Sequence, residues 1–363
     1  MTLQFRQNKS FLKKHKTILL IFFGIILFVL ADLIYISFSW NKTKNNNLSY
    51  QPKTLQNQNQ ASENTKPEES TASNTLLFVG DIMLSRHVGT KIVNAKNPNA
   101  PFLETASITK KADIAFANLE SPFSDKGKRV TEGMVFKAEP DTVNGLLYAG
   151  FDIVSLTNNH FGNQGSYGEN YTFNLLSQNN IAYVGAGENL TKAGEPVIIE
   201  KNGIKFAFLA FDDINSTYTP QSYVASATSP GVNPLSEIAL KNSIEKTKQK
   251  ADVVIVTVHW GTEYKTAPNA TQIKLAHSAI DSGASLVIGH HPHCVQYYQE
   301  QIYEKYSGGY IFYSLGNFVF DQMWSEITKK GLIAQIIFKG KNIEKVESFP
   351  ITIYDYFQPR VDK

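Results

Sequence analysis

The sequence has only one cysteine in 363 residues, Cys294, and this scarcity excludes several kinds of protein. A single cysteine cannot form an internal disulfide, so the fold must be held together by its core. A closed zinc site built from several thiolates is excluded too, as is a lipid anchor on an N-terminal cysteine. We predict that Cys294 is a small buried hydrophobe rather than a thiol nucleophile.

Basic residues are not in excess outside the first segment of the chain. The whole chain carries a net charge of +3, whereas residues 1–44 contain seven Lys and Arg and one acid. Residues 45–363 are therefore mildly acidic, with a net charge of −3. Nucleic-acid-binding domains present a basic surface, so we expect no nucleic-acid partner.

One long hydrophobic run lies near the N-terminus. Residues 17–31 carry no charge, and the apolar character continues past Asp32 to Trp40. About 20 apolar residues can cross a bilayer, and the lysines and arginines before the run favour a cytoplasmic N-terminus. We predict a basic cytoplasmic segment (1–16) and a single transmembrane anchor (17–40) in the cell membrane, with the rest of the chain outside. A cleaved signal peptide is the alternative, although no small-residue cleavage site follows Trp40.

The remaining chain divides into a spacer and one folded domain. Residues 41–74 are rich in polar residues and predict a disordered linker, and 75–363 can form one large domain. Short apolar strands alternate with amphipathic helices, which is typical of an α/β fold. We expect strands at 75–80, 112–119, 152–157, 181–185, 253–260, 285–289 and 309–315, hairpins at 196–211 and 331–351, and helices at 140–149, 168–179, 234–250 and 269–282.

Polar residues that can bind metals follow six of the predicted strands. The carboxyl ends of parallel strands meet at one edge of a sheet, where ligands bind in open α/β folds. Carboxylate, amide and imidazole groups together suit Mn, Fe or Zn better than Ca or Mg. In an extended segment, His291 and His293 would point the same way and bind one ion or two adjacent ions. The residues that follow the strands are Asp81, Asn118, Glu120, Asn158, Asn159, His160, His259, His290, His291, His293, Asn317 and Asp321.

The segments that carry these residues resemble the motif series of the capsule synthesis protein CapA family, which is associated with poly-gamma-glutamate synthesis. They are "GDIMLSR" (80–86), "NLESP" (118–122), "NNH" (158–160), "HWGTEY" (259–264), "GHHPH" (289–293) and "YSLGNFVFDQ" (313–322). All six occur in the family's order, and the resemblance covers residues 75 to about 325. The family is similar to calcineurin-like metallophosphoesterases. The resemblance therefore implies a four-layer αββα sandwich with a two-metal site.

The resemblance implies, residue by residue, a set of ligands that would hold two divalent metal ions. His160 would be a general acid that assists the leaving group. Arg86 would hold an anionic group, because arginine suits bidentate contact with oxyanions. We expect Asn118, Asn158, Glu263, His290, Asn317 and Asp321 to orient the ligands from behind. The implied ligands are Asp81, Glu120, Asn159, His259, His291 and His293.

Three departures from the phosphoesterase pattern leave the activity open. Met83 occupies the place of a histidine ligand, and a thioether binds such ions poorly. Glu120 replaces a bridging aspartate motif only approximately, and Asn163 stands where the family commonly has aspartate. A metal-dependent hydrolase of a phosphoester or related envelope bond is one hypothesis. The other is a non-catalytic accessory that binds an anionic envelope polymer. Either role would involve the membrane and other membrane proteins of a capsule synthesis complex.

Overall fold

The computed structural model describes residues 73–213 and 223–362, which form two β-sheets with helices outside them. The larger sheet has eight strands in the order β16-β15-β14-β1-β2-β3-β4, with β13 also paired to β1. The neighbours from β1 to β4 are parallel, and β14 to β16 are antiparallel. Its strands are β1 (Ser73–Ile82), β2 (Ile114–Leu119), β3 (Ile153–Ser155), β4 (Ala182–Val184), β13 (Asn317–Val319), β14 (Lys330–Lys339), β15 (Asn342–Tyr354) and β16 (Gln358–Val361).

The smaller sheet has six strands in the order β11-β12-β10-β9-β7-β6. Its central strands β7, β9, β10 and β12 are parallel, and the edge strands β6 and β11 are antiparallel to their neighbours. The strands are β6 (Val197–Lys201), β7 (Ile204–Asp212), β9 (Val253–His259), β10 (Leu286–His290), β11 (Glu304–Tyr306) and β12 (Gly309–Phe312), and β5 (Ala186–Gly187) and β8 (Gly231–Val232) form a separate pair.

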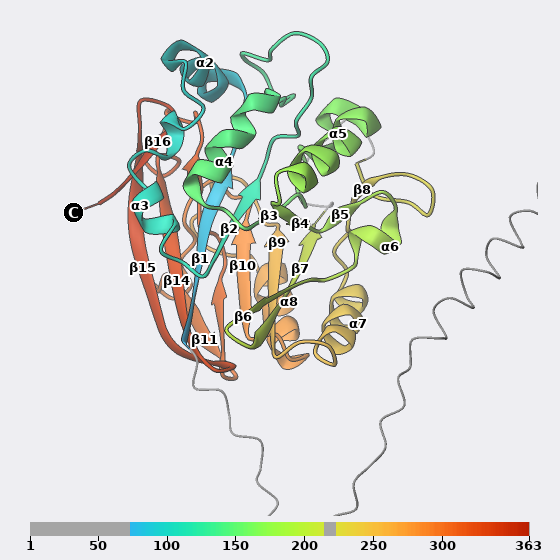
Figure 1. Cartoon of the computed structure of the whole chain (residues 1–363). Coiled ribbons are helices and arrows are strands. Elements are labelled where there is room, and N and C mark those ends of the chain that lie inside the picture. Colours follow the sequence, from blue (N-terminus) through green and yellow to red (C-terminus); the bar gives the residue numbers. More distant parts are fainter. Residues whose placement is uncertain (1–72, 214–222, 363) are drawn as a thin grey trace, which may run out of the picture. The chain divides into compact units, whose positions relative to one another are not determined.

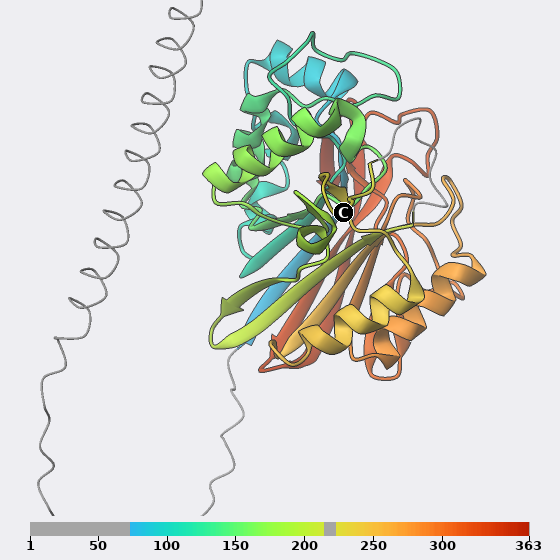
Figure 2. The ribbon, with the colours of Figure 1, turned by 90° about the vertical axis from the view of Figure 1, so that its right-hand side faces the viewer.

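Helices cover the outer face of each sheet (Figures 1 and 2). The larger sheet is covered by the helices that precede β5, and the smaller sheet by α7 and α8. Together with the sheets they make a helix–sheet–sheet–helix arrangement. The helices are α2 (Arg86–Ala95), α3 (Ala106–Thr109), α4 (Val143–Ala149), α5 (Gly165–Gln178), α6 (Leu190–Ala193), α7 (Glu237–Thr247) and α8 (Ala270–Asp281), with 3-10 turns η1 (Ala100–Phe102), η2 (Pro140–Thr142) and η3 (Phe161–Gln164).

Three apolar layers follow from this arrangement. Between the sheets, Phe116 of β2 stacks on Phe208 of β7 with ring centroids 5.9 Å apart. Under the helices of the larger sheet, Leu146 of α4 and Phe173 of α5 are buried with strand residues. Ile244 of α7 is buried on the outer face of the smaller sheet. Most strands are buried on both faces, which explains their continuous apolar runs.

Most predicted elements are present, with ends shifted by a few residues. The hairpin predicted at 196–211 turns at Asn202 and Gly203, whose φ angles are 49° and 78°, as a type I′ turn requires. Strand β1 begins at Ser73, two residues before the strand predicted at 75–80. Helix α2 and strand β16 were not predicted, although Val88 and Ile92 of α2 are four residues apart and are buried on one face of the helix.

The predicted anchor at 17–40 lies outside the described residues, as does the linker up to residue 72. Among residues 73–213 and 223–362, no helix is both long and apolar enough to span a bilayer.

Candidate metal centre

The predicted polar residues meet where strands of both sheets end. Asp81 at the end of β1 lies beside Asn118 of β2 in the larger sheet. His259 at the end of β9 lies beside His290 of β10 in the smaller sheet. The backbone N–H of His291 donates to Asp81 Oδ2 at 3.3 Å, which joins the two sheets at this edge. The strand ends thus bring together residues that are far apart in the sequence.

Two glycines allow this close approach of strands. A Cβ on Gly80 would lie 2.0 Å from the carbonyl oxygen of Gly316, and one on Gly289 would lie 1.9 Å from that of Tyr313. Neither backbone has room for a side chain. Gly80 immediately precedes Asp81, and Gly289 is two residues before His291, so the close approach of these backbones brings both residues to the site.

A first cluster consists of Asp81, Glu120 and His293, all fully buried. His293 Nδ1 lies 3.5 Å from Asp81 Oδ2, and His293 Nε2 lies 3.6 Å from Glu120 Oε1. One ligand atom from each residue lies within 4.8 Å of the others, so the group could hold a metal ion. Glu120 Oε1 and Oε2 are buried without a hydrogen-bond partner. A buried carboxylate with no donor is unfavourable unless something positive faces it.

In the first cluster, the charges of the two acids and of His293 offset the effect of burial on one another's pKa. Burial raises the pKa of Glu120 well above its usual range, although the charge of His293 opposes this. Burial would lower the pKa of His293, but Glu120 and Asp81 raise it to about 9. Burial also disfavours ionised Asp81, yet His293, His290 and Asn118 lower its pKa below the usual value. Without a metal ion, the protonated His293 therefore supplies the positive charge that faces the two carboxylates.

A second cluster consists of Asn159, His259 and His291 and carries no formal charge. His259 Nε2 lies 2.9 Å from Asn159 Oδ1 and 3.1 Å from His291 Nδ1. Burial lowers the pKa of His259 far below the ordinary value, and lowers that of His291 to about 3. Both rings are neutral at physiological pH, which is the form that binds metals. His291 Nε2 is also buried without a partner.

The H-x-H segment is not extended, contrary to our prediction. His291 has a φ of 97° and His293 a φ of 55°, both in the region that favours glycine. Their ring centroids are 6.0 Å apart, and the two rings face different clusters. Such backbone strain is maintained only when the surroundings impose it, and it is common at functional sites. Cys294 is buried as predicted, and burial raises its pKa to about 12.

His160 stands beside the first cluster, with Nε2 3.9 Å from Glu120 Oε1. Its Nδ1 lies 2.9 Å from Asn163 Oδ1, which also accepts the backbone N–H of Phe136 at 2.6 Å. Because Asn163 Oδ1 is an acceptor, the proton is assigned to His160 Nδ1, and the Nε2 lone pair faces Glu120. Burial lowers the pKa of His160 to about 3. The ring also stacks on Phe136, with centroids 3.8 Å apart.

Four of the residues expected behind the ligands contact them or hold their strands. Asn118 donates to Asp81 Oδ1 at 2.8 Å, and Asn158 donates to Asn118 Oδ1 at 3.2 Å. Asn317 Oδ1 lies 3.0 Å from His293 Nδ1. His290 Nε2 turns away from the site to the carbonyl of Val79, at 3.2 Å. These contacts fix the orientation of the first cluster.

Arg86 and Asp321 form an ion pair close to the first cluster, where the charge of Arg86 acts to lower the pKa of Glu120. Arg86 also donates to the carbonyl of Gly133 at 2.9 Å, so its guanidinium ties together the loops 125–135 and 320–328. Arg86 Nε is buried and has no partner. Glu263 is half-buried, and its charge contributes to the raised pKa of Glu120.

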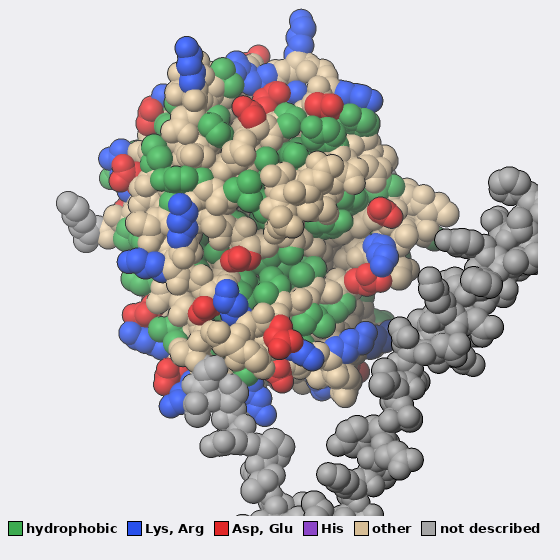
Figure 3. Space-filling view, in the orientation of Figure 1, with side chains coloured by type: hydrophobic (Ala, Val, Ile, Leu, Met, Phe, Trp, Pro, Cys, Tyr) green, Lys and Arg blue, Asp and Glu red, His purple; other side chains and the backbone are tan. Residues whose placement is uncertain are grey.

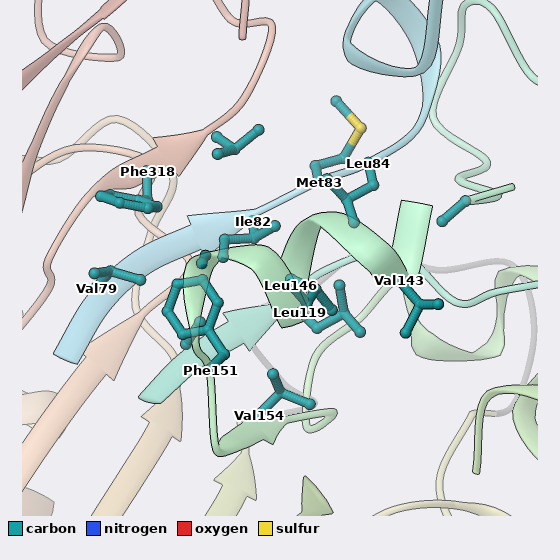
Figure 4. Close-up of a cluster of buried hydrophobic side chains, with 14 of the residues drawn as sticks. Val79, Ile82, Met83, Leu84, Leu119, Val143, Leu146, Phe151, Val154 and Phe318 are labelled. Carbon is teal, nitrogen blue, oxygen red and sulfur yellow. The ribbon is translucent and has the colours of Figure 1, made fainter. Parts of the chain in front are cut away.

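Met83 lies within the apolar layer of the larger sheet (Figure 4). It is fully buried, and its sulfur accepts the backbone N–H of Ser85 at 3.1 Å. The Met83 side chain therefore packs in the hydrophobic core.

Sequence reasoning missed Phe136 and Tyr264. Phe136 stacks on His160, as described above, and Tyr264 stacks on His293 with ring centroids 6.2 Å apart. Both are aromatic residues in loops, where no periodicity marks them. Tyr264 lies within a quoted motif and has a φ of 64°, a strained backbone that only the structure reveals.

The fold and the site define an α/β protein with a buried carboxylate–histidine centre where its two sheets meet. The chain belongs to the bacterial capsule synthesis protein PGA_cap family, whose model matches residues 75–322. This match confirms the resemblance carried by the six motifs.

Named relatives agree with this family. The chain is 33% identical over 289 residues to the capsule biosynthesis protein CapA of Bacillus anthracis, covering 77% of this chain and 68% of that protein. It is 33% identical over 295 residues to the PGA biosynthesis protein CapA of Bacillus subtilis, covering 80% and 75%. A probable polyglutamine synthesis accessory protein of Mycobacterium tuberculosis is 26% identical over 254 residues, covering 67% of this chain and 65% of that protein.

Proposed function

We propose that this protein is a metal-dependent, phosphoesterase-like hydrolase that acts outside the cell membrane in the synthesis or anchoring of a capsule polymer of the poly-gamma-glutamate type. The observation that carries the proposal is Glu120, whose two buried carboxylate oxygens have no hydrogen-bond partner and face a histidine and an aspartate. Such an acid is stabilised when a cation binds beside it.

The donor set fits two divalent ions of the Mn, Fe or Zn type. Ligand atoms about 2.1 Å from a tetrahedral zinc ion are about 3.4 Å apart. In the second cluster, His259 Nε2 lies 2.9 Å from Asn159 Oδ1 and 3.1 Å from His291 Nδ1, which is close to this spacing. In the first cluster, one ligand atom from each residue lies within 4.8 Å of the others. Asp81, Glu120 and His293 would hold one ion, and Asn159, His259 and His291 the other.

Bound ions would polarise an oxygen of the substrate and generate hydroxide from water. The chain's own residues would position the substrate and handle its proton. His160 is neutral in this structure, because its pKa is about 3, so it must accept a proton at Nε2 before it can protonate a leaving group. The general-acid role of His160 and the anion-binding role of Arg86 remain predictions.

The experiment that tests the proposal is the metal content of the full-length protein purified in detergent, followed by hydrolysis of p-nitrophenyl phosphate with and without chelator. Bound ions and chelator-sensitive hydrolysis are the expected result. A protein that takes up neither Mn nor Zn would contradict the proposal. The matched variant is Glu120→Gln, which keeps the shape but removes the charge.

The second candidate is a non-catalytic accessory that binds an anionic polymer through the same site. Two residues favour it, because Met83 supplies core packing in place of a ligand and Asn163 cannot stabilise a protonated His160 as aspartate would. On the face drawn in Figure 3, Lys and Arg side chains are mixed with Asp and Glu, so this face offers a polyanion no field of one sign. Metal binding without hydrolysis would favour this candidate.

A further inference from the structure

The ring of His293 is held by residues that belong to neither cluster. Tyr264 stacks on it with centroids 6.2 Å apart, and Phe320 lies against it at 4.7 Å with an interplanar angle of 58°. Asn317 Oδ1 lies 3.0 Å from His293 Nδ1. The backbone N–H of Tyr264 also donates to the carbonyl of Pro292 at 2.8 Å. Tyr264 therefore contacts both the ring of His293 and the turn that carries it.

The amide of Asn317 can lie in only one orientation. Its Nδ2 donates to the backbone carbonyl of Thr328 at 2.9 Å and to that of His293 at 3.4 Å. Both partners can only accept, so Oδ1 must face His293 Nδ1. Asp81 Oδ2, at 3.5 Å from the same nitrogen, is also an acceptor. A neutral His293 ring therefore keeps its proton on Nδ1, and its lone pair lies on Nε2, which faces Glu120.

Gln322 links Asn317 to Tyr264. Gln322 is 9% exposed, and its Oε1 accepts a hydrogen bond from Asn317 Nδ2 at 3.1 Å. Its Nε2 donates to the Tyr264 hydroxyl at 3.4 Å. Burial raises the pKa of Tyr264, and so do the charge of Glu263 and the hydrogen bond that the phenol donates to it. The donors from His293 to Glu263 therefore all point the same way along one chain, an arrangement in which hydrogen bonds strengthen one another.

We propose that Tyr264 and Gln322 are positioning residues of the metal centre, which hold His293 with Nε2 presented to the ion. The φ angles of Tyr264 and His293, 64° and 55°, are unfavourable and need such surrounding contacts. Outer partners of a metal-binding histidine affect affinity although they do not touch the ion. This inference rests on the proposed function for the ion, but the position of the His293 proton can be measured without metal or hydrolysis.

The first test is the affinity of the full-length protein in detergent for Mn, measured by calorimetric titration. Gln322→Met removes both hydrogen bonds of the amide, and we expect the affinity to fall on the order of tenfold or more. Tyr264→Phe keeps the stacked ring and removes only the longest bond of the chain, so its loss should be smaller. The double variant should lose no more than Gln322→Met alone, because the hydroxyl reaches Asn317 only through Gln322. Equal affinities in the wild type and Gln322→Met would overturn the proposal.

Gln296→Met is the matched control for the loss of a buried glutamine. Gln296 is 1% exposed. Its side-chain partners are Gln272, at 2.8 Å, and the carbonyls of Lys265 and Ala267, at 3.0 and 3.2 Å, none of which belongs to the two clusters. We expect it to lower the denaturant midpoint about as much as Gln322→Met and to leave the affinity for Mn unchanged. An equal loss of affinity in both variants would assign the effect to lost stability and overturn the positioning role.

The second test is ¹⁵N NMR of the metal-free, histidine-labelled protein at pH 10. His293 is neutral there, because its pKa is about 9, and His293→Ala identifies its signals. We expect the proton on Nδ1 in the wild type, and a larger share of the Nε2–H tautomer in Gln322→Met. A proton on Nε2 in the wild type would overturn the inference. A wild type that takes up no metal but keeps the proton on Nδ1 would contradict the proposed function alone.

Discussion

The first and second clusters, the two halves of the candidate centre, differ in charge. The first cluster has two carboxylates and a histidine whose pKa they raise to about 9, so a proton already stands in for positive charge. The second cluster has an amide and two neutral imidazoles, with no charge to compensate an ion. The comparison indicates that an ion bound in the first half would replace a proton, whereas an ion bound in the second half would be held by neutral ligands alone. We therefore expect the first half to bind its ion more tightly.

The largest effect expected is the loss of metal on removal of a ligand from the first cluster. His293→Ala removes the imidazole ring whose Nδ1 faces Asp81 and whose Nε2 faces Glu120. We expect the metal affinity of the first cluster to fall on the order of 100-fold or more, since even outer partners contribute 10- to 100-fold. His259→Ala should leave the first ion bound. Metal analysis after dialysis distinguishes the two variants, and equal losses in both would contradict the division into halves.

The next effect is the pH dependence of metal uptake. Because His293 must lose its proton to bind a metal, apparent affinity should rise about tenfold per pH unit until the pH reaches about 9. The second cluster should show no such slope at neutral pH, because the pKa of His291 is about 3. Calorimetric titration of His259→Ala between pH 6 and 8 isolates the first ion, and a flat profile would refute proton exchange.

The same proton affects the stability of the metal-free protein. The pKa of His293 is about 9 in the fold and ordinarily 6.5, so its contribution is complete below about pH 6.5 and disappears as the pH rises through 9. Metal-free protein should therefore unfold at a lower denaturant concentration at pH 9 than at pH 6. In His293→Ala this loss of stability between pH 6 and 9 should be reduced.

The positions of Asp81, Asn118 and His259 could be predicted from the sequence, because parallel strands end at one edge. The orientation of His291 and His293 could not be predicted, because the positive φ angles on either side of Pro292 depend on polar contacts with Asp81 and Asn317 rather than on local preference. The same holds for Phe136 and Tyr264, whose contacts come from loops. The alternation of apolar residues predicts where a strand ends at the edge of the sheet. It does not predict the conformation of the loop that follows.

A smaller effect is expected from restoring a histidine at the place of Met83. Met83→His would put a polar ring in an apolar layer, so we expect about 2 kcal/mol loss of unfolding free energy, and no additional bound metal. Met83→Leu is the control and should change stability by less than about 1.5 kcal/mol. Denaturant unfolding and metal analysis give both readouts. An extra ion in Met83→His would show that this position does face the first cluster.

The smallest effect concerns Asn163, which decides how His160 is held. Asn163→Asp would place a carboxylate at the position of an amide oxygen 2.9 Å from His160 Nδ1, so the pKa of His160 should rise. Burial opposes the charge on both groups, which limits the expected rise to about one unit. The acidic limb of the pH–rate profile for p-nitrophenyl phosphate should move to higher pH if His160 acts as a base, and the alkaline limb should do so if it acts as an acid. Asn163→Ala, which removes the acceptor altogether, separates loss of ring orientation from change of charge. If neither limb moves in Asn163→Asp while metal content is unchanged, His160 does not transfer the proton.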